Sequence, residues 1–75
     1  MLQYKNKNGD TIKKYEDDCD EGNLFLNDKK VGIFTIEHDS KLGSYYHITL
    51  NSGKQFHDHY HDDNDIIHEL SFPTT

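Results

Sequence analysis

The chain has 75 residues and a net charge of −6, and 32% of its residues are hydrophobic. This length supports a single domain, residues 1–75, with a small core, and no apolar run is long enough to cross a membrane. All 8 basic residues are lysine, so the arginine contacts that often read phosphates and guanine edges are missing, which argues against direct nucleic-acid binding. The single cysteine excludes an intrachain disulfide and, with no signal-like apolar run, indicates a cytoplasmic protein.

The first predicted element is an N-terminal hairpin. Asn8-Gly9 separates two short alternating segments, which is the usual signal of a two-residue turn between antiparallel strands. A helix over residues 11–20 is the alternative, because several of its apolar residues would share one helical face. The charges oppose that helix, since Lys13 and Lys14 would lie at its positive end and acidic residues at its negative end.

A second hairpin is predicted from Asn23 to His38, with its turn at Asn27–Lys30. The expected register pairs Leu26 with Val31 and Leu24 with Ile33, which places these four aliphatic side chains on one face. Phe34 and Ile36 then point to the other face. The strand that carries them is therefore expected to be covered on both sides.

A third hairpin is predicted from Ser44 to His61, after a turn at residues 39–43. Partners directly opposite one another lie on the same face, so the register should unite the apolar side chains of both strands. The register that does so pairs Leu50 with Phe56, Ile48 with Asp58 and Tyr46 with Tyr60. On the opposite face it pairs Thr49 with His57, His47 with His59 and Tyr45 with His61.

Histidines gather on that second face and suggest a metal site. The candidate metal ligands are His47, His57, His59 and His61. Residues two apart on a strand are about 7 Å apart and point the same way, so two imidazoles can reach one ion and a third can come from the neighbouring strand. Zinc in a structural role suits such nitrogen-rich sites best, and nickel and copper also fit. The alternatives are an exposed polar face and a proton-sensitive switch.

A short C-terminal helix is predicted after His61. Acidic residues and Asn64 suit its N-cap and first turn, and Ile66, Ile67 and Leu70 form one apolar stripe. Ser71-Phe72-Pro73 should end it. The predicted fold class is therefore α+β: a small, strongly twisted antiparallel sheet of sequential hairpins, with about five or six strands and one short C-terminal helix.

Catalytic motifs are sparse. Cys19 lies among acidic residues that disfavour a thiolate, so we expect a small buried residue or, alternatively, a metal ligand. The glycines are isolated, so no phosphate-binding loop is expected. We expect the protein not to be an enzyme, and the one enzymatic alternative is a small hydrolase built on a histidine-bound metal.

Two acidic groups are the other prominent feature, one at residues 16–21 and one at residues 58–65. The candidate partner-binding residues in them are Glu16, Asp17, Asp18, Asp20, Glu21, Asp58, Asp62, Asp63 and Asp65. Their carboxylates can pair with a cationic partner surface or only keep the chain soluble. Candidate apolar anchors for such a partner are Tyr4, Tyr15, Tyr45 and Tyr60.

In size and composition the chain resembles the small single-domain proteins that bacteriophages of low-GC Gram-positive hosts encode against host defences. The shared features are acidity, abundant tyrosine, lysine, asparagine, aspartate and isoleucine, and the absence of arginine. Among them it looks most like the anti-CRISPR inhibitors of type II-A RNA-guided nucleases, some of which mimic nucleic acid with acidic surfaces. The resemblance covers the whole chain and matches no functional residues.

The resemblance implies a viral inhibitor in the cytoplasm of the host bacterium that blocks DNA engagement by binding the nuclease directly. Such a protein would act as a monomer or weak dimer. A restriction enzyme or a nucleotide-signalling effector is an alternative partner, and a generic acidic interaction module without metal is the alternative function.

Overall fold

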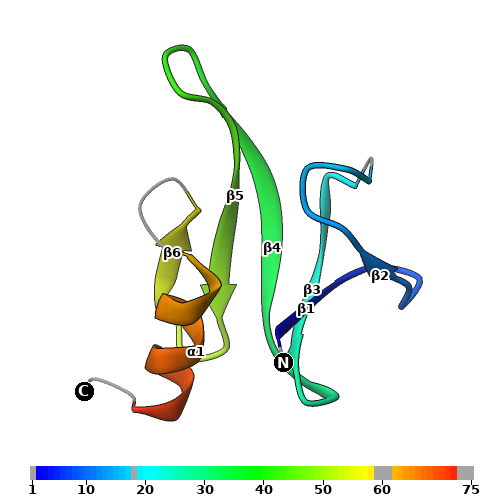
Figure 1. Ribbon diagram of the computed structural model, residues 1–75, viewed down its shortest axis with the longest axis vertical. Helices are drawn as coiled ribbons and strands as arrows, with labels where there is room; N and C mark the ends of the chain where they lie inside the picture. The colour runs from blue at the N-terminus through cyan, green and yellow to red at the C-terminus, as the bar shows by residue number, and fades with distance from the viewer. Residues whose placement is uncertain (1, 18, 59–61, 73–75) are drawn as a thin grey trace.

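The structure is a computed structural model that describes residues 2–17, 19–58 and 62–72, and it confirms the predicted α+β class. One six-stranded antiparallel sheet carries a single helix on one face (Figure 1). The elements are β1 (Leu2–Asn6), β2 (Thr11–Ile12), β3 (Glu21–Leu26), β4 (Lys29–Asp39), β5 (Gly43–Leu50), β6 (Gln55–His57) and α1 (Asp63–Ser71).

The strand order is β2-β1-β3-β4-β5-β6, so the run of sequential hairpins is interrupted once. β1 pairs with β2 on one side and with β3 on the other. The chain leaves β2 at the sheet edge and returns past β1 to reach β3. The segment between β2 and β3, whose described residues 13–17, 19 and 20 are hereafter called the 13–20 loop, therefore spans the width of β1 instead of forming a tight turn.

The predicted N-terminal hairpin is confirmed, and β2 and turns take the place of the alternative helix in the described part of residues 11–20. Its loop has three residues instead of two, because the N–H of Gly9 donates to the carbonyl of Asn6 and the N–H of Asn6 donates to the carbonyl of Asp10, at 3.0 and 2.9 Å. Gly9 has a φ of 91°, which completes this bulged turn.

The second hairpin exists, but its predicted register is wrong. Leu26 pairs with Lys29 across a two-residue turn, and Leu24 pairs with Gly32, so Val31 is an extra residue in β4. This β-bulge reverses the alternation beyond it. As a result Phe34 is buried on the same face as Leu24, whereas Ile33 lies on the opposite face and is 45% exposed.

The third hairpin has the predicted faces with a different register. His47 pairs with His57 and Ile48 with Phe56, two residues away from the predicted partners. The cause is a loop of three residues, 51–53, in which Gly53 adopts a φ of 96° and its N–H donates to the carbonyl of Leu50 at 2.8 Å. A shift of two residues preserves the face of every side chain. The predicted partners His59, Tyr60 and His61 lie outside the described residues.

The core lies between the sheet and α1. Phe34 and Tyr46 form its centre, with ring centroids 5.5 Å apart in an edge-to-face arrangement, and Ile66 of α1 is fully buried in the same cluster. The helix begins as predicted among acidic residues, although Asp62 and not Asn64 is the N-cap, and the side chains of Asp62 and Asp65 form a reciprocal capping box. It ends at Ser71, with Phe72 as the C-cap.

Replacing Gly22 with alanine is expected to destabilise this core by about 1–3 kcal/mol, the usual cost of overpacking. An added Cβ would meet the carbonyl oxygen of Lys5 and, at 2.8 Å, the ring of Phe34. The check is urea denaturation, with Asn23→Ala on the opposite face as the control. Equal midpoints for the two variants would contradict the close packing of β1, β3 and Phe34.

Candidate functional site

Lys14 connects its own loop to two aspartates that lie more than forty residues later in the sequence. Its ammonium group donates to Asp58 Oδ1 and to Asp63 Oδ1, both at 3.1 Å. It also lies 4.9 Å from the centroid of the Tyr4 ring, in cation–π contact. Lys14, Asp58 and Asp63 together with Tyr4, Tyr15 and Tyr46 are called the Lys14 cluster below. The cluster ties the 13–20 loop to the start of α1.

Tyr15 fixes the loop in place through three contacts. Its hydroxyl donates to Asp58 Oδ2 at 2.7 Å, and its backbone N–H donates to the hydroxyl of Tyr46 at 3.2 Å. Its ring packs on that of Tyr46 with centroids 4.8 Å apart. Tyr15 has a φ of 65°, a conformation that is unfavourable for a bulky residue. These contacts offset that strain, while 59% of the residue remains exposed to solvent.

The cluster changes the proton affinity of its own members. Burial raises the pKa of Tyr4, and the charge of Asp63 together with the 2.9 Å hydrogen bond to it raises it further. Burial lowers the pKa of Lys14, but its bonds to Asp58 and Asp63 outweigh this effect, so that its pKa is raised overall. Burial and the hydrogen bond to Asp58 raise the pKa of Tyr15 to about 12.

The first acidic group borders this cluster. Glu16 and Asp17 follow Tyr15 directly and are exposed, as are Asp20 and Glu21, whereas Asp18 lies outside the described residues. Two members have partners within the chain: Glu21 forms an ion pair with Lys7, and Asp17 Oδ2 accepts a hydrogen bond from the backbone N–H of Lys13 at 2.8 Å.

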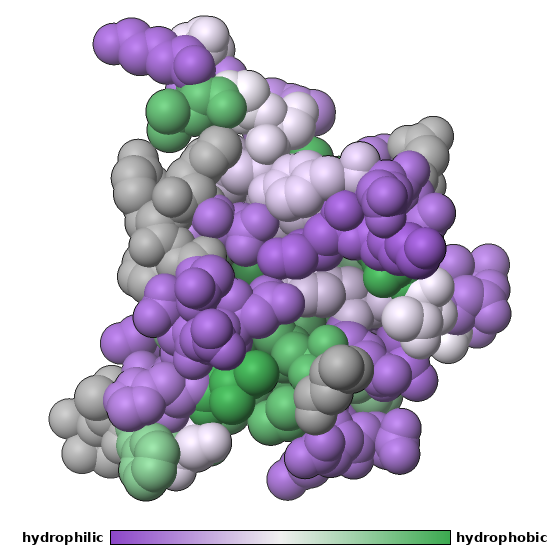
Figure 2. Space-filling model, viewed as in Figure 1, coloured by the Kyte–Doolittle hydropathy of each residue, from purple (hydrophilic) through white to green (hydrophobic). Residues whose placement is uncertain are grey.

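The second acidic group is largely engaged within the protein. Asp58 and Asp63 are held by Lys14, and only 10% of the Asp58 side chain is exposed. Asp62 and Asp65 are exposed, but their carboxylates accept the backbone hydrogen bonds of the capping box. Two carboxylates share one ammonium group in the cluster, so the region where the two acidic groups meet retains negative charge. Figure 2 shows hydrophilic side chains crossing the molecule between α1 and the loop, above an apolar area.

The predicted histidine face is the open face, the face of the sheet that points away from α1. His47 and His57 lie side by side on it, with stacked rings whose centroids are 4.6 Å apart. The Nδ1 atom of His47 contacts Glu37, whose pKa is lowered by the hydrogen bonds from His47 and Tyr45. The Nε2 atom of His47 is 3.0 Å from Gln55 Oε1. Both ring nitrogens of His47 therefore already have oxygen partners.

The predicted metal ligands include two further histidines, and Cys19 is an alternative ligand. His59 and His61 lie outside the described residues, and within the described ranges no group of three or more histidine, cysteine or acidic side chains is arranged to hold an ion. Cys19 is half-buried, and its thiol donates to the carbonyl of Glu21 at 3.2 Å. The predicted ligand set therefore stays a prediction.

The Lys14 cluster was missed by the sequence analysis. The sequence patterns involve Lys14 only as a charge that opposes the alternative helix, and Asp58 and Asp63 only as candidate partner-binding carboxylates. A lysine next to a tyrosine in a loop gives little indication that the lysine will form an ion pair with a distant segment. Lys14, Asp58 and Asp63 become partners only when folding brings the 13–20 loop close to the start of α1.

Comparison of the chain with protein-family models, curated proteins and solved structures finds no match. α1, with 9 residues, is far too short to cross a bilayer, and the described part of the chain contains no helix that could do so.

Proposed function

We propose that this chain is a phage-type inhibitor that binds a host defence enzyme acting on nucleic acid, with a type II CRISPR nuclease as the leading target. The observation that supports this proposal is the meeting of the two acidic groups at the Lys14 cluster. The exposed Glu16 and Asp17 directly follow Tyr15 of the cluster, and the exposed Asp62 directly precedes Asp63. The result is one acidic surface built from distant parts of the chain.

The chemistry of that surface fits a cationic channel. Such nucleases hold the guide–target heteroduplex in a positively charged channel. Exposed carboxylates on the 13–20 loop and at the start of α1 would pair with its lysines and arginines, and these long-range attractions would speed association at low salt. Occupying the channel would prevent DNA engagement without any catalytic step by the inhibitor.

Tyr15 is the proposed anchor of this contact. It is 59% exposed and lies beside Glu16 and Asp17, while its hydroxyl is held by Asp58. An aromatic side chain that is already fixed loses little conformational freedom on binding, and such residues carry much of the binding energy in interfaces. Of the other tyrosines considered as anchors, Tyr4 is buried in the core.

The test is a pull-down with guide-loaded nuclease followed by a DNA-cleavage assay. Glu16→Lys and Asp20→Lys should each weaken binding by about tenfold, or about 1.4 kcal/mol, and binding should weaken as salt rises. Asp10→Lys, which makes the same charge change at the exposed β1–β2 turn, is the matched control. No complex at low salt together with undiminished cleavage would refute the proposal for this target.

A structural zinc ion on the open face is part of the same proposal. The adjacent imidazoles of His47 and His57 support it, because neighbouring strands place both rings on one face. A metal ion bound by His47 Nε2 would replace the contact of that atom with Gln55 Oε1. Untagged protein should then retain about one equivalent of metal by elemental analysis, and EDTA should lower the melting temperature. His59→Ala should reduce retention, whereas His38→Ala should not. A metal-free preparation that is unchanged by EDTA would contradict the metal site.

A further inference from the structure

The described residues leave the open face of the sheet uncovered, and this face includes apolar surface at its centre. None of the described open-face side chains of the strands is buried, in contrast to the face that packs on α1. Ile33 of the central strand β4 is 45% exposed there, with the half-buried rings of Phe25 and Tyr45 on the neighbouring strands. A chain of 75 residues gains stability when such a face is covered.

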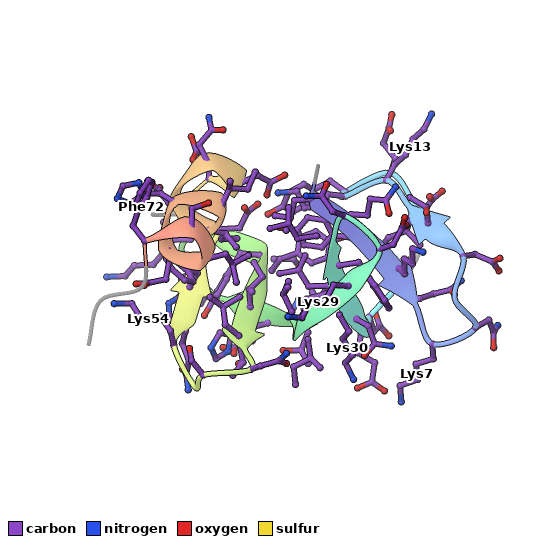
Figure 3. The ribbon with its side chains drawn as sticks, turned by 90° about the horizontal axis from the view of Figure 1, so that it is seen from below. Lys7, Lys13, Lys29, Lys30, Lys54 and Phe72 are labelled. Carbon is purple, nitrogen blue, oxygen red and sulfur yellow. The ribbon has the colours of Figure 1, made fainter. Side chains whose placement is uncertain are left out.

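The charges on this face are arranged along β4. Lys30, which pairs with Phe25, lies toward one end of the strand. Glu37, which pairs with Tyr45, lies toward the other, where its carboxylate also contacts Tyr45 and His47. Figure 3 shows Lys30 on the side of the sheet away from α1. Lys5 adds a second cation near the Lys30 end, 4.7 Å from the Phe25 ring. Ile33 lies between the two oppositely charged ends.

This arrangement is complementary to itself. If a second copy is turned by a two-fold axis that crosses β4 near Ile33, Lys30 of each copy faces Glu37 of the other. Ile33 then meets its own symmetry mate beside the axis. Two-fold dimers use one surface patch on both subunits in this way, and stacked sheets bury their facing side chains in a layer about 10 Å thick.

The molecule as a whole is broad enough for such an interface. The two longer extents of the molecule are 33 and 28 Å, and a stable interface buries about 800 Å² on each partner. We propose that this chain forms a two-fold dimer in which the open faces of two copies stack, with β4 of one copy antiparallel to β4 of the other. The dimer leaves the acidic surface beside α1 accessible, and its existence does not depend on the proposed inhibitory function.

Sedimentation equilibrium over a range of protein concentrations tests the dimer. The buffer contains EDTA, so that metal bridging between histidines does not contribute. The wild-type chain should dimerise, and Ile33→Lys should raise the dissociation constant at least tenfold. Leu42→Lys is the matched control, because Leu42 is 52% exposed at the β4–β5 turn, away from the centre of the face. Far-UV circular dichroism verifies that both variants are folded.

A charge exchange tests the antiparallel arrangement itself. Lys30→Glu alone and Glu37→Lys alone should each weaken the dimer, because like charges then face each other. The double variant Lys30→Glu with Glu37→Lys again places opposite charges at positions 30 and 37 of facing copies, so it should recover dimerisation. A wild-type chain that stays monomeric at millimolar concentration would overturn the proposal. A dimer that tolerates Ile33→Lys, or that the double variant fails to restore, would also overturn it.

Discussion

Replacing Lys14 with methionine is expected to lower the free energy of unfolding by about 1–3 kcal/mol, between the values for exposed and for buried ion pairs. The pairs are partly buried, since 22% of the Lys14 side chain and 41% of the Asp63 side chain are exposed. Methionine keeps most of the apolar stem but removes the ammonium group that holds two carboxylates. Among the described side chains, Asp58, with 10% of its side chain exposed, would then keep only the hydroxyl of Tyr15 as a hydrogen-bond donor. The measurement is urea denaturation followed by circular dichroism.

Lys13→Met is the matched control, because Lys13 is the exposed neighbour in the same loop. Its substitution should change stability by no more than about 0.5 kcal/mol, as is usual at the surface. The double variant Lys14→Met with Asp58→Asn should recover part of the loss, since the uncompensated charge is then removed. Equal unfolding midpoints for Lys14→Met and Lys13→Met would contradict a stabilising role of the cluster.

Stability is expected to fall steeply as the pH rises above 10. The pKa values of Tyr4, Lys14 and Tyr15 are all raised in the folded chain, and that of Tyr15 reaches about 12. Above the ordinary values of 10.0 and 10.5, the unfolded chain releases these protons while the folded chain keeps them. The unfolded state then binds fewer protons, so the free energy of unfolding decreases as the pH rises.

For the buried Tyr4 alone, the decrease approaches about 1.4 kcal/mol per pH unit above its unfolded pKa. Below pH 9 the contribution of these groups is fully present, because both states are protonated. Urea denaturation at pH 8, 9, 10 and 11 measures the slope. Tyr4→Phe should be less stable at pH 8, since it lacks the bond to Asp63, yet it should lose less stability between pH 10 and 11. Equal slopes for Tyr4→Phe and the wild-type chain would contradict the raised pKa of Tyr4.

The Lys14 cluster links stability to the proposed interface. The contacts that hold Tyr15 at a φ of 65° also determine where Glu16 and Asp17 emerge from the surface. Lys14→Met should therefore weaken binding to a partner even under conditions in which the variant remains folded. An exposed acidic loop that lacked this attachment would present the same charges without a fixed arrangement.

The amino-acid sequence alone was sufficient for the elements and for several of their faces. Asn8-Gly9 separates two short alternating segments, and an acidic start followed by an aliphatic stripe defines α1. These signals are local: each depends on conformational preferences and alternation within about ten residues. For the same reason His47 and His57 were placed correctly on one face, although the predicted pairing was shifted by two residues.

The tertiary structure alone decided the register of β4 and the composition of the Lys14 cluster. The bulge at Val31 depends on how β3 fits β4, and one extra residue is enough to exchange the faces of Ile33 and Phe34. Lys14 contacts Asp58 and Asp63 because the folded sheet places the loop between β2 and β3 within side-chain reach of the segment that leads into α1. Neither feature has a periodic signal, because bulges and ion pairs between distant segments arise from packing between elements and not from the preferences of any one segment.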